Sequence, residues 1–154
     1  MNGADIVKQF MIALESQEFT LASDYLADDF TFTGMTPRPL NKRQFIMLVK
    51  ELKYGMPNLS FNVRDIHETN NELVQEQNAE CTVQLTGTQS SIMELVPLSL
   101  PPIPETNRRV ILPAQQWHFT FENDKITAIV APPVAGGGIP GLLAQLDIDA
   151  PIVQ

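Results

Sequence analysis

The spacing of apolar residues changes at Pro57, and this change limits the folds that the chain can adopt. Before Pro57, apolar residues recur at every third or fourth position, as they do along one face of an amphipathic helix. After it they alternate with polar residues, as in strands that bury one face. Helices followed by strands with short turns predict an α+β domain, in which helices cover one side of a curved antiparallel sheet.

Three helical segments are predicted before that proline. The first spans 4–16, and the second follows an N-cap at Thr20 and ends near Asp28. The third begins at a capping box formed by Asn41 and Gln44, in which each side chain bonds the backbone amide of the other residue.

Strands are predicted where apolar and polar residues alternate. These segments are 30–33, 59–64, 78–86, 116–121 and 125–130. Asn70-Asn71 and Asn123-Asp124 are predicted to form turns between strands.

Two further segments combine apolar residues with proline. The connection 88–107 is longer than an ordinary loop, and connections of that length are usually functional or mobile. Because it is too apolar for a solvated linker, it must cover another part of the protein or be covered itself. The segment 131–154, with a short amphipathic helix after Pro140, is predicted to form an apolar flap that packs on a domain of residues 1–130.

The charge balance argues against a nucleic-acid partner. The 154 residues carry 10 basic and 18 acidic side chains, a net charge of −8, whereas nucleic-acid binding needs a basic surface. Basic residues concentrate in 38–64, where Glu51 is the one acid. This cluster could bind an anionic partner. We favour a solvated face of the third helix, with Lys53 among the residues that lie off its apolar stripe.

No metal or cofactor is expected. Cys81 is the one cysteine, which excludes an internal disulfide and a Cys/His zinc site, and it is predicted to be a small buried apolar residue. The Gly136–Gly138 run lacks the lysine of a phosphate-binding loop and is predicted to be a hinge.

A transmembrane segment is not expected either. The uncharged stretch 126–146 has about the length of a membrane span, but its prolines and glycines would break a helix there. A strand followed by the apolar flap is therefore predicted. The N-terminus lacks the pattern of a secretory signal, so we expect a cytoplasmic location.

Several stretches together resemble the NTF2-like superfamily, and within it the SnoaL-like polyketide cyclases. They are the aromatic strand in LADDFTF, the helix that ends at YGMPNLSF and the closing WHFTFENDKITAI. Gly87-Thr88, the proline-rich insert and Arg109-Val110 match the order of that branch before its penultimate strand. Over residues 4–130, the resemblance implies a cone: a strongly curved antiparallel sheet wrapped around three N-terminal helices. It also implies a cavity at the open end and a homodimer formed through the outer face of the sheet.

The resemblance does not carry over the catalytic groups of the family's enzymes. It places Phe10 where steroid isomerases have a tyrosine and Gly34 near the position of their aspartate, and 129–133 has no carboxylate where polyketide cyclases have one. Proton abstraction needs a base within hydrogen-bond reach. The remaining catalytic candidates are His118, which alternation with its neighbours directs away from the cavity, and Tyr25.

A ligand would contact the aromatic and apolar side chains on the concave face of the sheet and on the helices. The predicted ligand-binding residues are Tyr25, Phe45, Phe61, Val83, Trp117 and Phe119. A one-residue slip of the strand register would exchange Trp117 and His118 between the two faces.

Three functions stay open at this point. The first is binding of a small apolar molecule without catalysis, which the missing base and the two apolar segments favour. The second is a cyclase or isomerase with a relocated acid–base group, His118 or Tyr25. The third is a protein-interaction module, in which the proline-rich insert and the C-terminal flap bury a partner chain.

Overall fold

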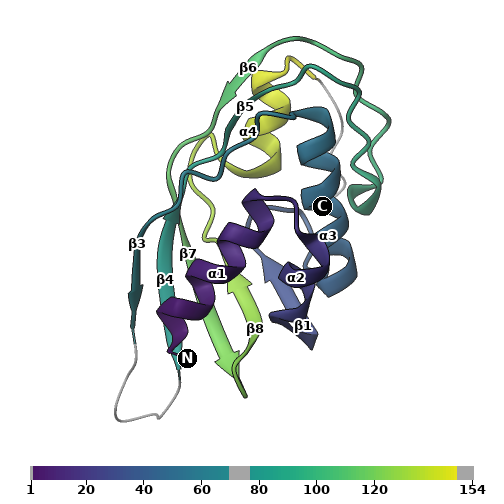
Figure 1. The fold of residues 1–154 in the computed structure, drawn as a ribbon. Helices are drawn as coiled ribbons and strands as arrows, with labels where there is room; N and C mark the ends of the chain where they lie inside the picture. The colour runs from purple at the N-terminus through teal and green to yellow at the C-terminus, as the bar shows by residue number, and fades with distance from the viewer. Residues whose placement is uncertain (1, 70–76, 149–154) are drawn as a thin grey trace.

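The computed structural model describes residues 2–69 and 77–148, and it has the predicted α+β architecture. Three helices, α1 (Gly3–Glu15), α2 (Phe19–Asp24) and α3 (Lys42–Gly55), lie over one face of the main sheet (Figure 1). The strands of that sheet are β1 (Leu26–Thr33), β2 (Leu40–Asn41), β3 (Arg64–Glu68), β4 (Asn78–Val83), β7 (Gln115–Glu122) and β8 (Lys125–Val130). A pair of short strands, β5 (Thr86–Thr88) and β6 (Arg109–Ile111), the 3-10 turn η1 (Val96–Leu98) and the helix α4 (Gly138–Gln145) complete the fold.

The main sheet has the order β2-β1-β8-β7-β4-β3, and its pairs are antiparallel with one exception. β1 pairs with β8 in parallel, with Leu26 opposite Ile126 and Phe32 opposite Ile129. The prediction of a purely antiparallel sheet is therefore corrected at this pair. Parallel strands need a long connection between them, and the elements from β2 to β7 form that connection between β1 and β8.

Several predicted elements are confirmed. α3 begins at the capping box, with both Asn41–Gln44 hydrogen bonds formed at 2.9 Å. Asn123 and Asp124 both have positive φ and form the tight turn between β7 and β8. The predicted turn at Asn70-Asn71 lies outside the described residues.

The second helix is shorter than predicted and begins earlier. Gln17 adopts the left-handed φ of 60°, which ends α1 and lets α2 begin at Phe19, so Thr20 is not its N-cap. α2 ends at Asp24 because the next residues join the sheet, where the amide of Ile126 donates to the carbonyl of Tyr25 at 2.8 Å. Sheet pairing at this point outweighs the helical spacing that had suggested an end near Asp28.

Two predicted strands are also interrupted. The left-handed φ of 45° at Asn62 breaks the segment 59–64, so β3 starts at Arg64, although Leu59 and Phe61 are buried as the alternation predicts. The segment 78–86 divides into β4 and β5, because the chain leaves the main sheet after Val83 and pairs next with β6.

The long connection 88–107 extends the β5–β6 pair into an arm. Met93 bridges to Ile103 across the arm, and both side chains are buried, as is Leu95. Gln89 is fully buried at the base of the arm, where its amide nitrogen donates to three carbonyls, including that of Ile103 at 3.1 Å. Its amide oxygen accepts from the backbone amide and the hydroxyl of Thr106. The apolar side of the arm therefore packs against the rest of the protein.

The uncharged stretch 126–146 forms β8, a turn and α4. α4 lies beside β6 at the same end of the molecule as the arm (Figure 1). Among the described residues, no helix has both the length and the apolar character that crossing a membrane requires.

Candidate ligand cavity

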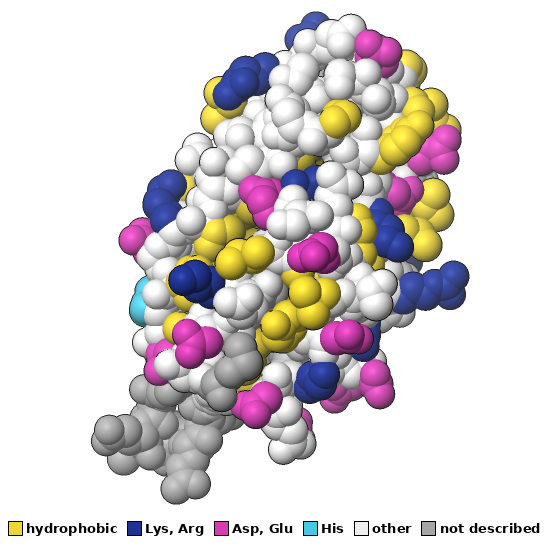
Figure 2. Space-filling view, in the orientation of Figure 1, with side chains coloured by type: hydrophobic (Ala, Val, Ile, Leu, Met, Phe, Trp, Pro, Cys, Tyr) yellow, Lys and Arg dark blue, Asp and Glu magenta, His cyan; other side chains and the backbone are white. Residues whose placement is uncertain are grey.

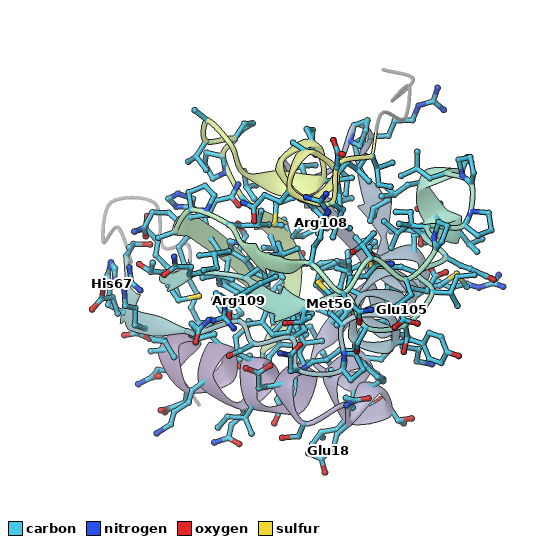
Figure 3. All side chains as sticks on the ribbon, turned by 90° about the horizontal axis from the view of Figure 1, so that it is seen from above. Glu18, Met56, His67, Glu105, Arg108 and Arg109 are labelled. Carbon is cyan, nitrogen blue, oxygen red and sulfur yellow. The ribbon has the colours of Figure 1, made fainter. Side chains whose placement is uncertain are left out.

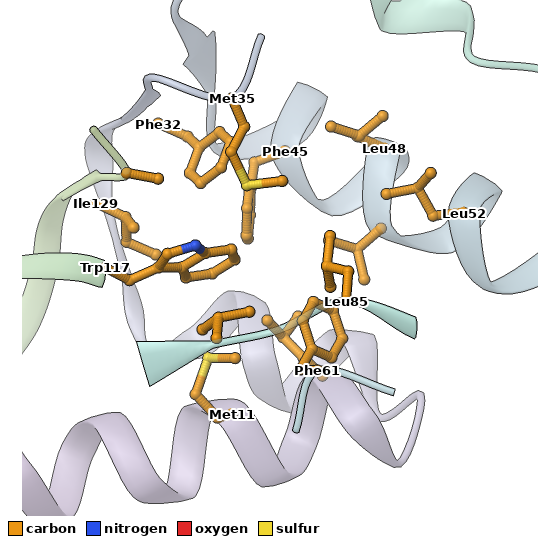
Figure 4. Close-up of a cluster of buried hydrophobic side chains, with 14 of the residues drawn as sticks. Met11, Phe32, Met35, Phe45, Leu48, Leu52, Phe61, Leu85, Trp117 and Ile129 are labelled. Carbon is orange, nitrogen blue, oxygen red and sulfur yellow. The ribbon is translucent and has the colours of Figure 1, made fainter. Parts of the chain in front are cut away.

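A small cavity lies at the end of the core that α4 and the arm cover. Its wall includes residues from β1, α3, the β5–β6 arm, β7 and α4, several of which surround it in Figure 4. The lining consists of Phe32, Met35, Phe45, Leu48, Val49, Leu52, Met56, Leu59, Phe61, Leu85, Thr86, Val110, Leu112, Trp117, Gly138, Ile139 and Leu142.

The cavity is apolar and small. Of the described side chains that line it, none is titratable, and Thr86 supplies the single hydroxyl. Its volume is about 30 Å³, room for one or two water molecules, whereas pockets for drug-sized ligands measure roughly 300–1,000 Å³. A ligand larger than a few atoms can therefore enter only if part of the wall moves.

Aromatic rings hold Trp117 at the cavity wall. Its indole makes edge-on contacts with Phe32 at 5.4 Å, Phe61 at 6.3 Å and Phe45 at 6.5 Å between ring centroids. Phe119, on the same face of β7, packs 6.4 Å from Trp117. These contacts leave the indole little freedom to rotate.

The indole nitrogen of Trp117 has no hydrogen-bond partner, although the side chain is 2% exposed. In Figure 4 the nitrogen lies on the edge of the ring toward Phe32. Most buried polar groups in proteins are hydrogen-bonded, so this unpaired donor is unusual.

α4 forms one part of the cavity wall and is attached by few hydrogen bonds. Ile139 and Leu142 face the cavity, and the amide of Ile139 donates to the carbonyl of Met35 at 3.0 Å. The Gln145 side chain bonds both the amide and the carbonyl of Ile111 at 2.7 Å. Gly138 has a φ of +67°, and a Cβ there would lie 3.0 Å from the Met35 carbonyl oxygen, so the chain needs glycine to bring α4 this close.

The predicted ligand-binding residues divide into two groups. Phe45, Phe61 and Trp117 line the cavity. Val83 and Phe119 are buried in the core away from the lining, and Tyr25 is half-buried at the end of α2. Other lining residues lie on β1 and α3, such as Phe32 and Leu52, just before β5, as Leu85 does, and on α4, such as Leu142. The apolar character of these segments was the available signal.

The two catalytic candidates lie outside the cavity wall. His118 lies on the other face of β7, 43% exposed, and its Nδ1 is 2.7 Å from a carboxylate oxygen of Glu80. The second oxygen of Glu80 is 3.4 Å from Nε2 of His67, so the three side chains form a row across β3, β4 and β7. Figure 3 shows His67 at the periphery, away from the cavity-lining Met56. Tyr25 does not reach the cavity either.

The resemblance expects an aspartate near Gly34 and a tyrosine at Phe10 in the family's isomerases, and this chain has neither. Gly34 has a φ of +108°, and a Cβ at this position would lie 1.8 Å from the carbonyl oxygen of Ala131, so no side chain fits. Phe10 is fully buried and stacks on Phe45 at 6.4 Å. Within the described residues, no cluster of three or more His, Cys, Asp or Glu side chains could hold a metal ion.

Cys81 is fully buried, as predicted, and burial raises the pKa of its thiol to about 12. At neutral pH it is therefore a protonated thiol with little nucleophilic character.

The basic cluster between residues 38 and 64 is not one solvated face, because Lys53 is buried. Its ammonium donates to the Glu15 carboxylate at 2.8 Å, the Glu15 carbonyl at 3.0 Å and the Leu59 carbonyl at 2.9 Å. The other oxygen of Glu15 accepts from the Ser60 hydroxyl and the Phe61 amide. Lys53 therefore joins the ends of α1 and α3 to the segment before β3. On the face drawn in Figure 2, basic and acidic side chains are interspersed.

Comparisons with known proteins agree with this architecture. The family model described as SnoaL-like domain matches residues 7–129. A SnoaL-like polyketide cyclase from Agrobacterium tumefaciens is 17% identical with a TM-score of 0.61, over 85% of this chain and 90% of that one. A provisionally assigned polyketide cyclase from Xanthomonas campestris pv. campestris is 16% identical with a TM-score of 0.63, over 92% and 94% of the two chains.

A third solved structure carries no assigned activity. It is an NTF2-like protein of unknown function from Cytophaga hutchinsonii, 16% identical with a TM-score of 0.54, over 85% of this chain and 89% of that one. No curated protein matches the chain. At these identities the solved structures establish the fold alone, while the match over most of the chain establishes the family. The chain belongs to the SnoaL-like domain family.

Proposed function

We propose that this protein binds a small, mostly apolar molecule in the cavity beneath α4. The observation that carries the proposal is the wall itself, in which apolar side chains from five parts of the fold meet without a titratable group among them. Apolar sites with few polar groups are typical of small-molecule binding. A base for proton abstraction would have to come from outside the described lining, so binding is favoured over a cyclase or isomerase reaction.

α4 is the wall that moves in this proposal. It is joined to the rest of the described chain through the Ile139 amide, the Gln145 side chain, a 3.8 Å contact between Arg108 and Asp147 and its apolar side chains. The Gly136–Gly138 run leads into the first residue of α4, and Gly136 has a φ of +77° with open space where a Cβ would lie. In this proposal α4 serves as a hinged cover, and Ile139 and Leu142 occupy space that a ligand takes when the cover opens.

The interaction-module alternative has less support. Met93, Leu95 and Ile103 of the arm and Ile139, Leu142 and Leu143 of α4 turn into this chain's own core. Ile92 and Val96 are exposed on the arm, and Ile92 lines a surface groove that also contains Tyr54, Lys50, Glu51 and Glu94, so charged side chains interrupt the apolar surface there.

Binding can be tested with Leu142→Ala, which enlarges the cavity. Indane, a compact hydrocarbon, serves as the probe, and the chain's single tryptophan gives one indole N–H signal in an NMR spectrum that reports on this cavity alone. Removing a buried leucine side chain leaves space that an apolar molecule can fill. We expect indane to shift the Trp117 signal and to bind Leu142→Ala at least about fivefold more tightly than the unmodified protein.

Leu143→Ala is the matched control, because Leu143 is buried on the same helix without lining the cavity. It loses stability to a similar extent and leaves indane affinity unchanged. If no probe perturbs Trp117 in either protein, or if the two variants gain affinity equally, the proposal is wrong.

We also propose that two copies pair through the outer face of the sheet. Polar side chains populate this face, among them Gln116 and the His67–Glu80–His118 row, and the described helices lie on the other face. Light scattering at micromolar concentration is expected to give a dimer mass, and Gln116→Arg is expected to weaken it through like-charge contact between copies. A monomer of the unmodified chain would contradict this assembly. A cytoplasmic location stays a prediction of the sequence.

A further inference from the structure

We propose that the groove between α2 and α3 docks an extended acidic segment of another protein, in which two carboxylates flank an apolar side chain. The groove shares no lining residue with the cavity beneath α4, so this docking goes beyond the proposed function and does not depend on it. Three properties of the groove support the proposal: its charge, the spacing of its cations and its apolar middle.

The groove lies where α2 packs against the first half of α3 (Figure 1). Its volume is about 590 Å³, within the range of roughly 300–1,000 Å³ that is typical of ligand sites. Most of its lining residues are exposed or half-buried, so a partner reaches it without movement of a wall. The lining consists of Ser23 of α2, Asp28 of β1, Asn41 of β2, and Lys42, Arg43, Ile46, Met47 and Lys50 of α3.

The groove is positive in a protein that is negative as a whole. Its lining has three cations, Lys42, Arg43 and Lys50, against one acid, Asp28, while the whole chain has a net charge of −8. The Asp28 carboxylate lies 3.7 Å from Nζ of Lys42 and offsets that charge. Among the described residues, no carboxylate lies within ion-pair distance of Arg43 or Lys50. The groove therefore presents two uncompensated cations and fits a partner with negative charge.

The two uncompensated cations lie at opposite ends of the groove. Arg43 and Lys50 are seven residues apart on α3, which separates their Cα atoms by about 10–11 Å along the helix axis. Ile46, which is buried, and Met47, which is half-buried, lie between them. A single phosphate or sulfate would contact one end and leave the apolar middle uncovered. The groove instead fits a molecule with two anionic groups and hydrocarbon between them.

An extended peptide has this distribution of groups. Alternate side chains of an extended chain point to the same side, and each residue adds about 3.3 Å. In a five-residue stretch with acids at both ends and an apolar residue in the middle, these three side chains share one face. The two acids are then about 13 Å apart, a span that the long side chains of Arg43 and Lys50 can meet. The apolar residue lies opposite Ile46 and Met47.

Two of the cations are already held in place. Nζ of Lys50 lies 5.6 Å from the centroid of the Phe19 ring at the start of α2. Nζ of Lys42 donates to the carbonyl of Leu26 at 3.2 Å. Side chains that are ordered beforehand lose less freedom when a partner binds, which favours association. A nucleic acid would place many more negative charges against the acidic remainder of this protein, so a short acidic segment fits better.

A synthetic peptide tests the docking. The probe is the acetylated and amidated peptide Ser-Glu-Ser-Leu-Ser-Glu-Ser, titrated against the full chain while the backbone amide signals are followed by NMR. We expect the signals of Met47 and Lys50 to shift. The same peptide with glutamine in place of both glutamates should bind at least about fivefold more weakly. A peptide with its two glutamates adjacent, Ser-Ser-Glu-Glu-Leu-Ser-Ser, should bind about threefold more weakly, because it reaches one end of the groove only.

A pair of charge-matched variants locates the site. Arg43→Gln combined with Lys50→Gln should weaken the probe about tenfold, because both uncompensated cations are lost. Lys8→Gln combined with Arg109→Gln removes the same charge at exposed positions outside the groove and should weaken it less than about twofold. All four side chains are exposed, so both variants are expected to fold.

Several results would overturn the proposal. They are absence of binding at millimolar peptide, equal affinity for the glutamine peptide, or an equal loss of affinity in the two charge-matched variants. If the α3 signals shift when the protein alone is diluted, a second copy covers the groove and the proposal is also wrong. None of these results bears on the cavity beneath α4, which indane and Leu142→Ala test separately.

Discussion

Lys53 and Trp117 both pack near the Phe61 ring, and the buried nitrogens of these two side chains differ in their hydrogen bonding. The ammonium of Lys53 is 5.7 Å from the ring centroid and donates three hydrogen bonds. The indole of Trp117, whose centroid is 6.3 Å from that of Phe61, has a nitrogen with no partner. The first site is complete within the chain, while the second has a donor for which the chain provides nothing.

The contrast is between a structural junction and an unpaired donor in the apolar core. Both environments are apolar, and both would penalise an unpaired polar atom. At Lys53 the fold gathers acceptors from residues far apart in sequence, which ties α1, α3 and the segment before β3 together. At Trp117 the fold brings together aromatic and aliphatic side chains, which offer the indole nitrogen no acceptor. Completeness of hydrogen bonding is therefore a local property, which differs between two side chains that pack near the same ring.

The largest expected effect is on the complete site. Lys53→Met should lower the free energy of unfolding by about 3–5 kcal/mol, because it leaves the Glu15 carboxylate without its cation and two carbonyls without donors. Chemical denaturation measures the loss. Lys8→Met, at an exposed position on α1, should change stability by less than about 0.5 kcal/mol. A loss at Lys53 no larger than that at Lys8 would mean that the junction is not needed.

The next effect tests whether the arm over the cavity is as firmly held as that junction. Gln89→Ala should destabilise the protein by about 2–3 kcal/mol, because five hydrogen bonds converge on its buried amide. Hydrogen exchange at the amides of Met93 and Ile103 should accelerate more than exchange in β7. Gln9→Ala on the exposed side of α1 is the control, and uniform acceleration across the chain would contradict a local anchor.

A smaller effect is expected at the attachment of α4. Gln145→Ala removes two bonds to Ile111 on the surface and should weaken docking of the helix by about 1 kcal/mol. Exchange of the Trp117 indole proton should become about fivefold faster, while global stability changes little. Asp147→Asn, which alters only the long contact with Arg108, should leave that exchange rate nearly unchanged. Equal rates in all three proteins would show that the cavity does not open through α4.

The smallest effect concerns a second unpaired atom near the arm, Oε1 of Glu51. Burial, together with the nearby Glu94, raises the pKa of Glu51 despite the hydrogen bond from the Val96 amide. The folded state thus favours the neutral acid, so its contribution to stability is present below the ordinary carboxyl pKa and is lost as pH rises through the raised value. Glu51→Gln should abolish this dependence and stabilise the protein at neutral pH by less than about 1 kcal/mol, measured by denaturation across the acid range. An unchanged pH dependence would contradict the assignment.

Local signals predicted much of the fold. The capping box of Asn41, the turn at Asn123-Asp124 and the alternation in 116–121 all act within a few residues, so the sequence shows them directly. The order of the predicted helices and strands along the chain indicated the α+β class and the resemblance to the family. Trp117 faces inward and His118 outward, as the alternation predicts.

What could not be predicted depends on partners distant in sequence. Lys53 lies off the apolar stripe of its helix, as a solvated lysine would, and only the approach of Glu15 and Leu59 makes a buried site for it. The end of α2 depends on pairing with β8. The role of α4 in the cavity wall depends on Gly138 bringing it against Met35, which no periodicity reveals.

The parallel pairing of β1 with β8 has a consequence for biosynthesis. Leu26 emerges from the ribosome long before Ile126, its neighbour in the finished sheet, so the nascent chain carries Phe30 and Phe32 on a strand that lacks its main partner. Non-local pairing of this kind raises contact order and slows folding, and an unpaired apolar strand invites aggregation. The last strand to be synthesised therefore completes the sheet, and a chain cut short before β8 leaves β1 without that partner.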